Sequence, residues 1–447
     1  MMPTVIKGKT EANNADLQER TRAMNIPTIG RLLLCTATLS ALLLAGKEQV
    51  QAADFSFKPS LAVSEEYTDN VFESNLTKKS DYITSAQPGL TFKYNAPLWD
   101  WDLGYNFSYR TYAKKTRGDE MNHNGNIKGL LKLVDEKLFL DLSDSYKRVS
   151  MDVTRDATKD SLYQNQSDQN LGTVSPYLVL HPTSTIMIKT GYRYVNTWYK
   201  DPQAVKKQDH IGFLETSYEV SPRFFANMGY TFTKEKPDNE KSGVASNSFM
   251  RHEAYLGPRY EYADKSFIFA QGGAIITKYS DRSKYTTSPF WSAGITHTFD
   301  TTTATLNTAV KYSDDPLGNT TTMDTSYNMN ITRTFNRGTL TLLGSYTEFS
   351  DADTKKVQNR RYTGGINGAY ELVQDLRGTF GFTYEYYNNI LLDSITRKYL
   401  GDCGLSYNFG KDLTLALTYK HTNYSSATIA ADNYKVNRVI LEVKKVF

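Results

Sequence analysis

Apolar and polar side chains alternate one by one along most of the chain, and the C-terminal stretch shows the pattern clearly. Val439, Leu441 and Val443 occupy every second position, the residues beside them include the charged Arg438, Glu442 and Lys444, and the chain ends on the aromatic Phe447. A period of two indicates a β-strand with unlike faces, because successive side chains point to opposite sides. An amphipathic helix would repeat every 3.6 residues instead. The same alternation recurs in residues 101–109, 224–232, 376–386 and 413–420.

The links between these stretches alternate in length. Short ones, such as 336–338 and 410–412, carry the Gly, Asn and Asp residues that favour tight hairpin turns. Others, such as 234–247 and 313–322, are longer and polar. Short turns on one side and long loops on the other are the layout of an outer-membrane barrel. We therefore predict an all-β fold, a transmembrane antiparallel up-and-down barrel over residues 53–447, with about twenty strands and eighteen as the alternative.

Lipid imposes a strict condition on such a chain. Every backbone N–H and C=O inside a membrane must be paired within the protein. A closed barrel does this while presenting only every second side chain to lipid, so a chain that is 39% hydrophobic can still span a membrane. The 32 tyrosines suit the membrane boundary. Soluble sandwiches and solenoids also alternate, but the regular order of turns and loops and the terminal Phe447 favour the barrel.

Two features predict where the chain is delivered. The apolar run 32–45, followed by small residues, predicts a Sec signal region over residues 1–52, with Met24 as an alternative start. Removal of this region leaves Cys403 as the one cysteine, which excludes an internal disulfide. We expect a protein exported to the outer membrane of a Gram-negative cell.

The C-terminal strand resembles the signal by which bacterial barrel-assembly machinery recognises its substrates. Phe447, Val443 and Leu441 supply its aromatic and apolar positions, whereas Lys445 stands where an apolar residue is preferred. This resemblance implies that the assembly machinery and outer-membrane lipid are partners of the chain.

Residues with catalytic or metal-binding chemistry do not form a known pattern. The six histidines are scattered without metal-ligand spacing, and a Gly-x-Ser-x-Gly elbow is absent. His421 could act at the rim of a barrel enzyme, but a lone rim histidine is the simpler interpretation. The acidic stretch 65–70 could bind Ca²⁺, yet it lacks the spacing of a calcium loop and is better explained as a solvated turn. We predict no enzyme, no cofactor and no metal, and the net charge of +4 is too small to imply a nucleic-acid partner.

The polar faces indicate what the interior could carry. If the apolar faces meet lipid, the opposite faces line a lumen that has more basic than acidic residues. A barrel of this size can hold a water-filled channel, and basic side chains on its wall favour anions. The alternative is that mixed charges only keep the channel hydrated. The predicted pore-lining basic residues are Arg110, Lys189, Arg193, Lys311, Arg377, Lys420 and Arg438.

The first part of the expected barrel resembles a known family. Residues 65–72, 80–84, 87–90 and 138–146 are similar to the start of the β-barrel porin 2 family, over residues 55–150 as a whole. Members of that family are often encoded beside exopolysaccharide or capsule synthesis and exosortase systems. The resemblance implies a part in polysaccharide export, with periplasmic and inner-membrane export components as partners, and it supplies no catalytic residues.

Three functions follow from these observations. The first is a porin-like barrel that exports an exopolysaccharide or capsular polysaccharide through a hydrated lumen. The second is a general diffusion porin for small, preferentially anionic solutes. The third is a surface adhesin or structural barrel with a plugged lumen, which an inserted loop such as 234–247 would favour.

Overall fold

The structure is a computed structural model, and it places most of the chain after the expected signal region. That region, residues 1–52 with Met24, lies outside the described residues, as does 239–247 of one long link. Asp54–Phe447 form one compact unit. The described residues are 53–134, 136–151, 166–238, 248–281, 283–314, 321–428 and 433–447.

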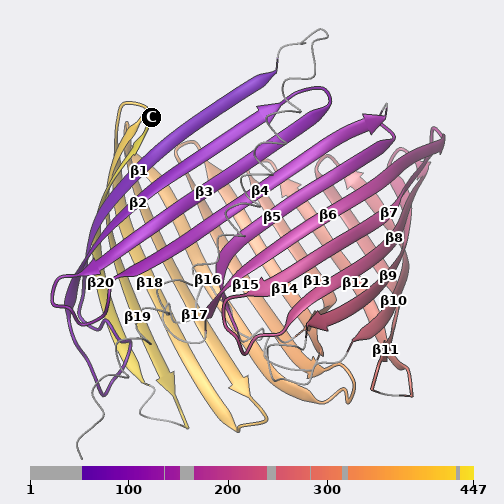
Figure 1. Cartoon of the computed structure of the whole chain (residues 1–447). Helices are drawn as coiled ribbons and strands as arrows, with labels where there is room; N and C mark the ends of the chain where they lie inside the picture. The colour runs from indigo at the N-terminus through magenta and orange to yellow at the C-terminus, as the bar shows by residue number, and fades with distance from the viewer. Residues whose placement is uncertain are drawn as a thin grey trace, which may run out of the picture. The chain divides into compact units, whose positions relative to one another are not determined.

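Twenty antiparallel strands in this part of the chain form one sheet, and the sheet closes because β1 pairs with β20 (Figure 1). The predicted fold class, an outer-membrane type of antiparallel β-barrel, is confirmed, with twenty strands rather than eighteen. Among the residues described, no helix is long and apolar enough to cross a membrane. The strands are β1 (Asp54–Thr68), β2 (Asp81–Asn95), β3 (Trp99–Tyr112), β4 (Glu120–Val134), β5 (Leu138–Ser150), β6 (Gln166–Thr183), β7 (Ile186–Tyr199), β8 (Lys206–Ser221), β9 (Phe224–Asp238), β10 (Phe249–Ala263), β11 (Ser266–Tyr279), β12 (Thr286–Phe299), β13 (Thr302–Asp314), β14 (Thr321–Phe335), β15 (Gly338–Asp351), β16 (Val357–Val373), β17 (Leu376–Asn389), β18 (Ser394–Phe409), β19 (Leu413–Ser426) and β20 (Tyr434–Val446).

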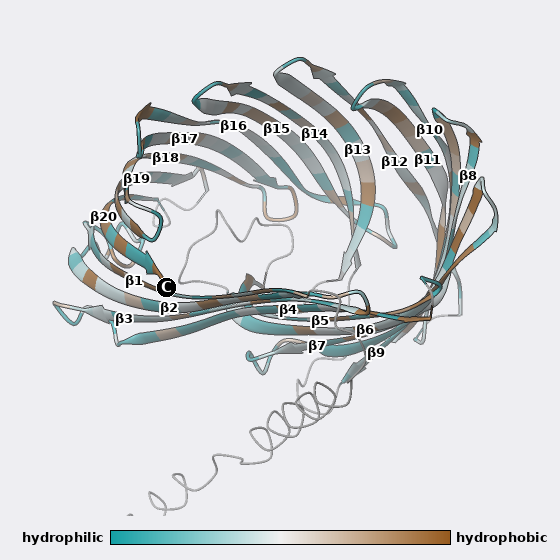
Figure 2. Ribbon diagram, turned by 90° about the horizontal axis from the view of Figure 1, so that it is seen from above, coloured by the Kyte–Doolittle hydropathy of each residue, from teal (hydrophilic) through white to brown (hydrophobic). Residues whose placement is uncertain are grey.

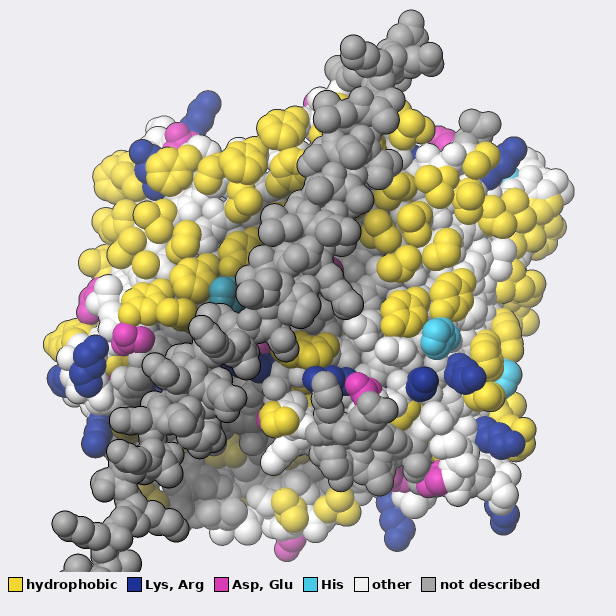
Figure 3. Space-filling model, in the orientation of Figure 1, with side chains coloured by type: hydrophobic (Ala, Val, Ile, Leu, Met, Phe, Trp, Pro, Cys, Tyr) yellow, Lys and Arg dark blue, Asp and Glu magenta, His cyan; other side chains and the backbone are white. Residues whose placement is uncertain are grey.

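The alternation read from the sequence becomes two faces of this wall. Leu417 of β19 pairs with Leu441 of β20, and the two side chains are 48% and 47% exposed. Hydrophobic side chains of this kind cover the outer surface between the strand ends (Figure 3). The residues between them point into the lumen. Exposure of large apolar side chains in register on one face is what a lipid-facing wall requires.

The two ends of the barrel differ as the link lengths predicted. The links after β10, β12 and β16 have two residues each, and Lys265, Asp300 and Asp375 there have positive φ angles of 53°, 39° and 64°. Tight hairpin turns need such backbone angles, and Asp tolerates them better than β-branched residues do. We call this the short-turn end, and the opposite rim the long-loop end.

The first and last strands close the barrel along a regular ladder. It runs from the pair Ser60 and Val446 to the pair Thr68 and Arg438. The terminal residue extends the ladder by one bond, because the N–H of Phe447 donates to the carbonyl of Pro59 over 2.8 Å. The C-terminal residue therefore has a structural part in the seam.

Prolines interrupt the ladder in two different ways. At Pro88, Pro176 and Pro258 two residue pairs are lost on one side, and pairing resumes beyond them. Near Pro289 the pairing of β12 with β13 stops at Ser292 and Ala309 and does not resume towards the long-loop end. Proline cannot donate to a ladder and is suited to a strand edge. Residues 286–291 of β12 thus form a free edge towards β13, which we call the split.

Beyond the split, the wall overlaps itself. The long-loop ends of β13 and β14, residues 310–314 and 321–323, form an inner arm that bends into the interior (Figure 2). Tyr312 Oη donates to the carbonyl of Pro289 over 3.1 Å, and Tyr279 Oη bonds Thr321 Oγ1 over 3.0 Å. Tyr312 and Thr321 belong by register to the outward face of their strands, yet they lie on the lumen face of β10–β12. The arm therefore narrows the interior at the long-loop end.

Candidate functional site: the lumen face

All seven basic residues named from the sequence lie on strands at lumen-facing positions. Each alternates with outward residues, as Lys420 does with the exposed Tyr419, and Lys420 pairs in register with Arg438. Their role in lining a conducting pore stays a prediction. The structure divides them by their surroundings into two guanidinium groups in ion pairs (Arg110, Arg438), two cations over aromatic rings (Lys189, Arg193) and three exposed side chains (Lys311, Arg377, Lys420).

The first group forms a compact network beside the seam. Glu66 lies 3.2 Å from Nη2 of Arg110 and 3.4 Å from Nη1 of Arg438, and Arg438 also reaches Glu73 over 2.7 Å. These four side chains are only 9–14% exposed. Two carboxylates thus neutralise two guanidinium groups, and this part of the lumen adds little to an anion-attracting field. Sequence alone did not show this, because Glu66 and Arg438 are joined only when the barrel closes.

The second group lies on β7, four strands further round the wall from Arg110 on β3. The ammonium of Lys189 lies 4.5 Å from the ring centre of Tyr177 and 5.9 Å from that of Phe213. The guanidinium of Arg193 lies 5.2 Å from the same Phe213 ring. An aromatic face attracts a cation without neutralising it. Glu215 of β8 stands opposite Lys189 in the register of the two strands, whereas Arg193 stands opposite Ile211. Arg193 in particular therefore keeps its charge available to a solute beside the wall.

Aromatic rings are unevenly distributed around the lumen. On β5–β12 they form a broad zone in which Phe139 and Tyr177 stack at 5.1 Å, and Arg259 lies 3.8 Å from the ring centre of Phe267. The lumen face of β13–β16 carries small polar residues at the same height, where Asn328 Nδ2 donates to Asn307 Oδ1 over 3.0 Å. The wall thus has an aromatic, cationic side and a small, polar side. The rings of the first side belong to Phe139, Tyr177, Phe213, Phe225, Tyr255, Phe267, Phe269 and Phe290.

The acidic stretch 65–70 has a structural part. The carboxylate of Asp69 accepts bonds from the N–H and the Nδ2 of Asn437 in β20, at 2.8 and 2.7 Å, and Lys78 lies 3.5 Å away. Asn70 Nδ2 donates to the carbonyl of Lys435 over 3.1 Å. These bonds clasp the β1–β2 loop to the last strand. Throughout the described residues, no group of three or more His, Cys, Asp or Glu side chains is placed to hold a metal ion.

Histidines take part in an outward feature that the sequence did not reveal. Each of three histidines lies opposite an aromatic residue of the preceding strand. The histidine is hydrogen-bonded to the tyrosine two positions before that aromatic residue. They are the fourth, fifth and fourth residues of β4, β8 and β10. We call this set the Tyr–His row. His421 is likewise bonded within the wall, to Asn437 over 2.8 Å. The Nδ1-to-Oη pairs of the row are His123 with Tyr105 at 2.7 Å, His210 with Tyr192 at 2.6 Å and His252 with Tyr230 at 2.8 Å.

Comparisons with known proteins bear on the fold. No protein-family profile matches the chain, and no curated protein matches it. The FrpB iron transporter from Neisseria meningitidis (F3-3 variant) is 7% identical with a TM-score of 0.52, over 91% of this chain and 82% of its own. Its F5-1 variant is 9% identical with a TM-score of 0.50, over 91% and 83%. The siderophore receptor PirA from Pseudomonas aeruginosa is 12% identical with a TM-score of 0.49, over 88% and 80%.

The first two likenesses, together with the closed sheet, place the chain in the class of outer-membrane β-barrels by fold. At these identities they carry no information on the solute. The resemblance to the β-barrel porin 2 family therefore stays a prediction.

The clasp gives a pH-dependent prediction. Burial raises the pKa of Asp69, but the two bonds from Asn437 and the charge of Lys78 outweigh it and hold this pKa below its ordinary value. A lowered folded-state pKa gives stability that is complete above the unfolded pKa, about 3.9, and lost as the pH falls through the folded pKa. We expect Asp69→Asn to lower the free energy of unfolding by about 1 kcal/mol at pH 7.

The measurement is the temperature at which the gel mobility of the detergent-solubilised barrel changes, taken from pH 7 to pH 3. The difference in this transition temperature between wild type and Asp69→Asn should become smaller below about pH 4. Asp264→Asn, in an exposed short turn, is the control and should match wild type. Equal stability at pH 7, or a gap that persists unchanged at pH 3, would contradict the clasp.

Proposed function

We propose that this chain is a porin-like barrel of the Gram-negative outer membrane whose lumen conducts anionic solutes. The observation that carries the proposal is the wall of β7, where Lys189 and Arg193 lie over the rings of Tyr177 and Phe213. Positive charge that is held in place on the wall raises the local concentration of anions. The Sec signal, the C-terminal strand ending in Phe447 and delivery by the barrel-assembly machinery are part of the same proposal.

The solute we favour is an exopolysaccharide or capsular polysaccharide. The family resemblance of residues 55–150 supports this, and so does the uneven wall. Flat rings suit the apolar faces of sugars, while the Asn, Ser and Thr side chains opposite can bond hydroxyl groups. Periplasmic and inner-membrane export components would then deliver the polymer at the short-turn end.

Two alternatives rest on particular observations. A general diffusion porin for small anions needs only the exposed cations, Lys311, Arg377 and Lys420, and no aromatic zone. A structural or adhesive barrel with a closed lumen is favoured by the inner arm, which narrows the interior. The guanidinium of Arg251 lies 5.6 Å from the ring centre of Tyr312 and stabilises the arm by a cation–π contact.

Conductance in planar bilayers tests the proposed anion path. We expect an open channel that prefers chloride over potassium, and the double variant Lys189→Gln/Arg193→Gln should lower this preference by roughly twofold or more. Lys234→Gln, on the outward face of β9, is the matched control and should leave it unchanged. A silent protein, or an equal effect of the control, would contradict the anion path.

Deletion of the gene tests the choice of solute. If the barrel exports a polymer, surface polysaccharide should be lost and restored by the wild-type chain, but only in part by Lys189→Gln/Arg193→Gln. A general porin would leave the surface polymer intact in the deletion strain. That outcome, with a conducting channel in bilayers, would select the diffusion porin instead.

A further inference from the structure

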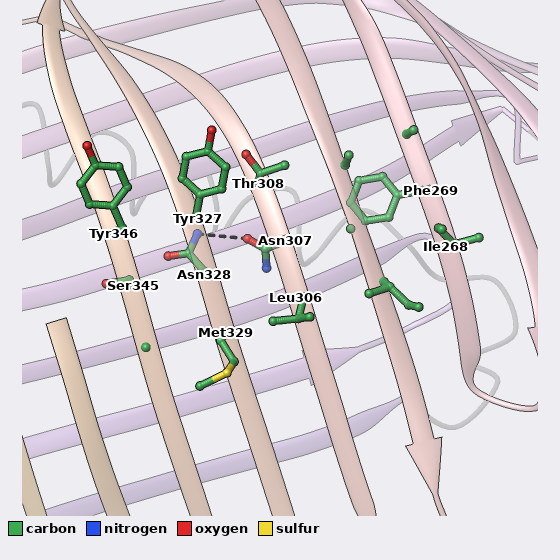
Figure 4. A pocket seen from close by; sticks show the side chains of 15 residues that line it. Ile268, Phe269, Leu306, Asn307, Thr308, Tyr327, Asn328, Met329, Ser345 and Tyr346 are labelled. Atoms are coloured by element: carbon green, nitrogen blue, oxygen red, sulfur yellow. Dashed lines mark hydrogen bonds between the residues drawn. The ribbon is translucent and has the colours of Figure 1, made fainter. Parts of the chain in front are cut away.

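A groove lies on the outward face of the wall, across β11–β15, and has a volume of about 590 Å³ (Figure 4). Ala293 and Gly344 form its floor, and the groove is deep there because their side chains are small or absent. Ile295, Leu306 and Met329 supply apolar walls on three neighbouring strands. An apolar groove on a lipid-facing surface is filled by acyl chains, because water there would be unfavourable.

The groove ends at the split. The last pair of β12 and β13 is Ser292 with Ala309, and the next pair towards the short-turn end, Ala293 with Thr308, already lines the groove. Trp291 Nε1 donates to Thr308 Oγ1 over 3.2 Å. The indole therefore lies at the boundary between the groove and the split. An apolar groove and a free strand edge are therefore continuous.

The split presents polar groups. In an antiparallel strand, alternate residues direct their N–H and C=O towards the neighbour on one side. Residues 286–291 have no ladder partner in β13, and the hydroxyl of Tyr312 bonds only one carbonyl, that of Pro289. A backbone edge of this kind binds polar groups readily. The groove thus needs an apolar occupant and the edge a polar one.

The height of the split suits lipid head groups. Tyrosine rings with a polar tip favour the boundary between hydrocarbon and water. The Tyr–His row lies four or five residues from the long-loop ends of its strands, and the split occupies the first six residues of β12. The strands have 13–18 residues, whereas 9–11 suffice to cross the hydrocarbon. The split therefore lies at head-group level and the groove within the hydrocarbon.

A cation completes the arrangement. Lys278, an exposed outward residue of β11, lies with its ammonium 5.2 Å from the ring centre of Tyr285. Its neighbour Thr277 pairs with Thr286, the first residue of the split. Lys278 is thus on the side of β12 away from the free edge, about one strand spacing from it. A positive charge at this place attracts an anionic head group that lies at the edge.

We propose that the split and the groove together form a site for lipid A, the phosphorylated, acylated glycolipid of the outer leaflet. One acyl chain lies in the groove, the sugar hydroxyls bond the edge of residues 286–291, and a phosphate lies at Lys278. The proposal rests on the proposed outer-membrane location, with the long-loop end outside. Lipid A fits better than a phospholipid, because its disaccharide head group offers both hydroxyl and amide groups to the edge as well as phosphate to the cation.

The test uses substitutions that fill the groove with a larger side chain. The mature barrel is reconstituted in nanodiscs that contain lipid A, phosphatidylglycerol and phosphatidylethanolamine, and native mass spectrometry then counts the retained lipids. Gly344→Phe should lose the bound lipid A, since a side chain there extends towards Met329, 3.5 Å from the new Cβ. Gly401→Phe, on the outward face of β18 with open space around it, is the control and should retain one lipid A. Lys278→Gln should weaken retention roughly two- to fivefold.

Several outcomes would overturn the proposal. One is that Gly344→Phe and Gly401→Phe retain lipid A equally. The others are that the wild-type barrel retains phosphatidylglycerol as well as it retains lipid A, and that the wild-type barrel retains no lipid A. Ala293→Leu fills the same floor if Gly344→Phe fails to fold. Conductance is measured on the same samples: an unchanged channel with lost lipid A supports this site alone, whereas a silent wild type refutes the proposed function and not the site.

The split itself is checked by disulfide trapping in a chain with Cys35 and Cys403 replaced by serine. If the ladder continued, Trp291 would face Val310. The pair Trp291→Cys/Val310→Cys should therefore stay reduced, while Ile295→Cys/Leu306→Cys, a pair in register, should oxidise. Efficient oxidation of the first pair would show a closed wall, and the lipid site would lose its polar edge.

Discussion

Backbone hydrogen bonding is the constraint on which the rest of the structure depends. A wall in lipid has no solvent to satisfy its N–H and C=O groups, so twenty strands must pair all the way round and the first must meet the last. The seam between β1 and β20 does this, and even the N–H of Phe447 is used, by the carbonyl of Pro59. Once pairing satisfies the backbone, side chains are free to differ on the two faces.

That freedom explains what could be predicted from sequence. The alternation of residues such as Val439, Leu441 and Val443 follows from the faces of a strand, and the turn residues follow from backbone angles, so fold class and strand number were both accessible. The lumen-facing register of the seven basic residues followed from the same periodicity. These are local properties, set by residues one or two positions apart.

Properties that depend on closure were not accessible. The network of Glu66, Arg110 and Arg438 joins β1, β3 and β20, and no local pattern announces it. Four prolines look alike in sequence, yet only at Pro289 does the pairing fail to resume beyond the proline, and there the inner arm offers Tyr312 as a substitute partner. The Tyr–His row needs three separate hairpins in register. The sequence signal that could have found it is the recurrence of Tyr-x-Phe or Tyr-x-Tyr opposite a histidine.

The lumen is consequently less uniform than a count of charges suggests. Two of the seven basic residues are neutralised beside the seam, two remain charged over rings on β7, and the inner arm narrows the long-loop end. An anion would meet the aromatic, cationic side of the wall with small polar groups opposite. Selectivity would then depend on one side of the barrel and not on the ring as a whole.

The central claim is that alternate side chains meet lipid while their neighbours meet water. Nitroxide labels placed one at a time on residues 224–234 of β9, which pairs along its length with β8 and β10, test it most directly. In liposomes, collision rates with oxygen should peak at even positions such as Met228 and Tyr230, and those with a water-soluble nickel complex at odd positions such as Asn227 and Thr231. Rates that rise and fall together, or that show no period of two, would contradict the account.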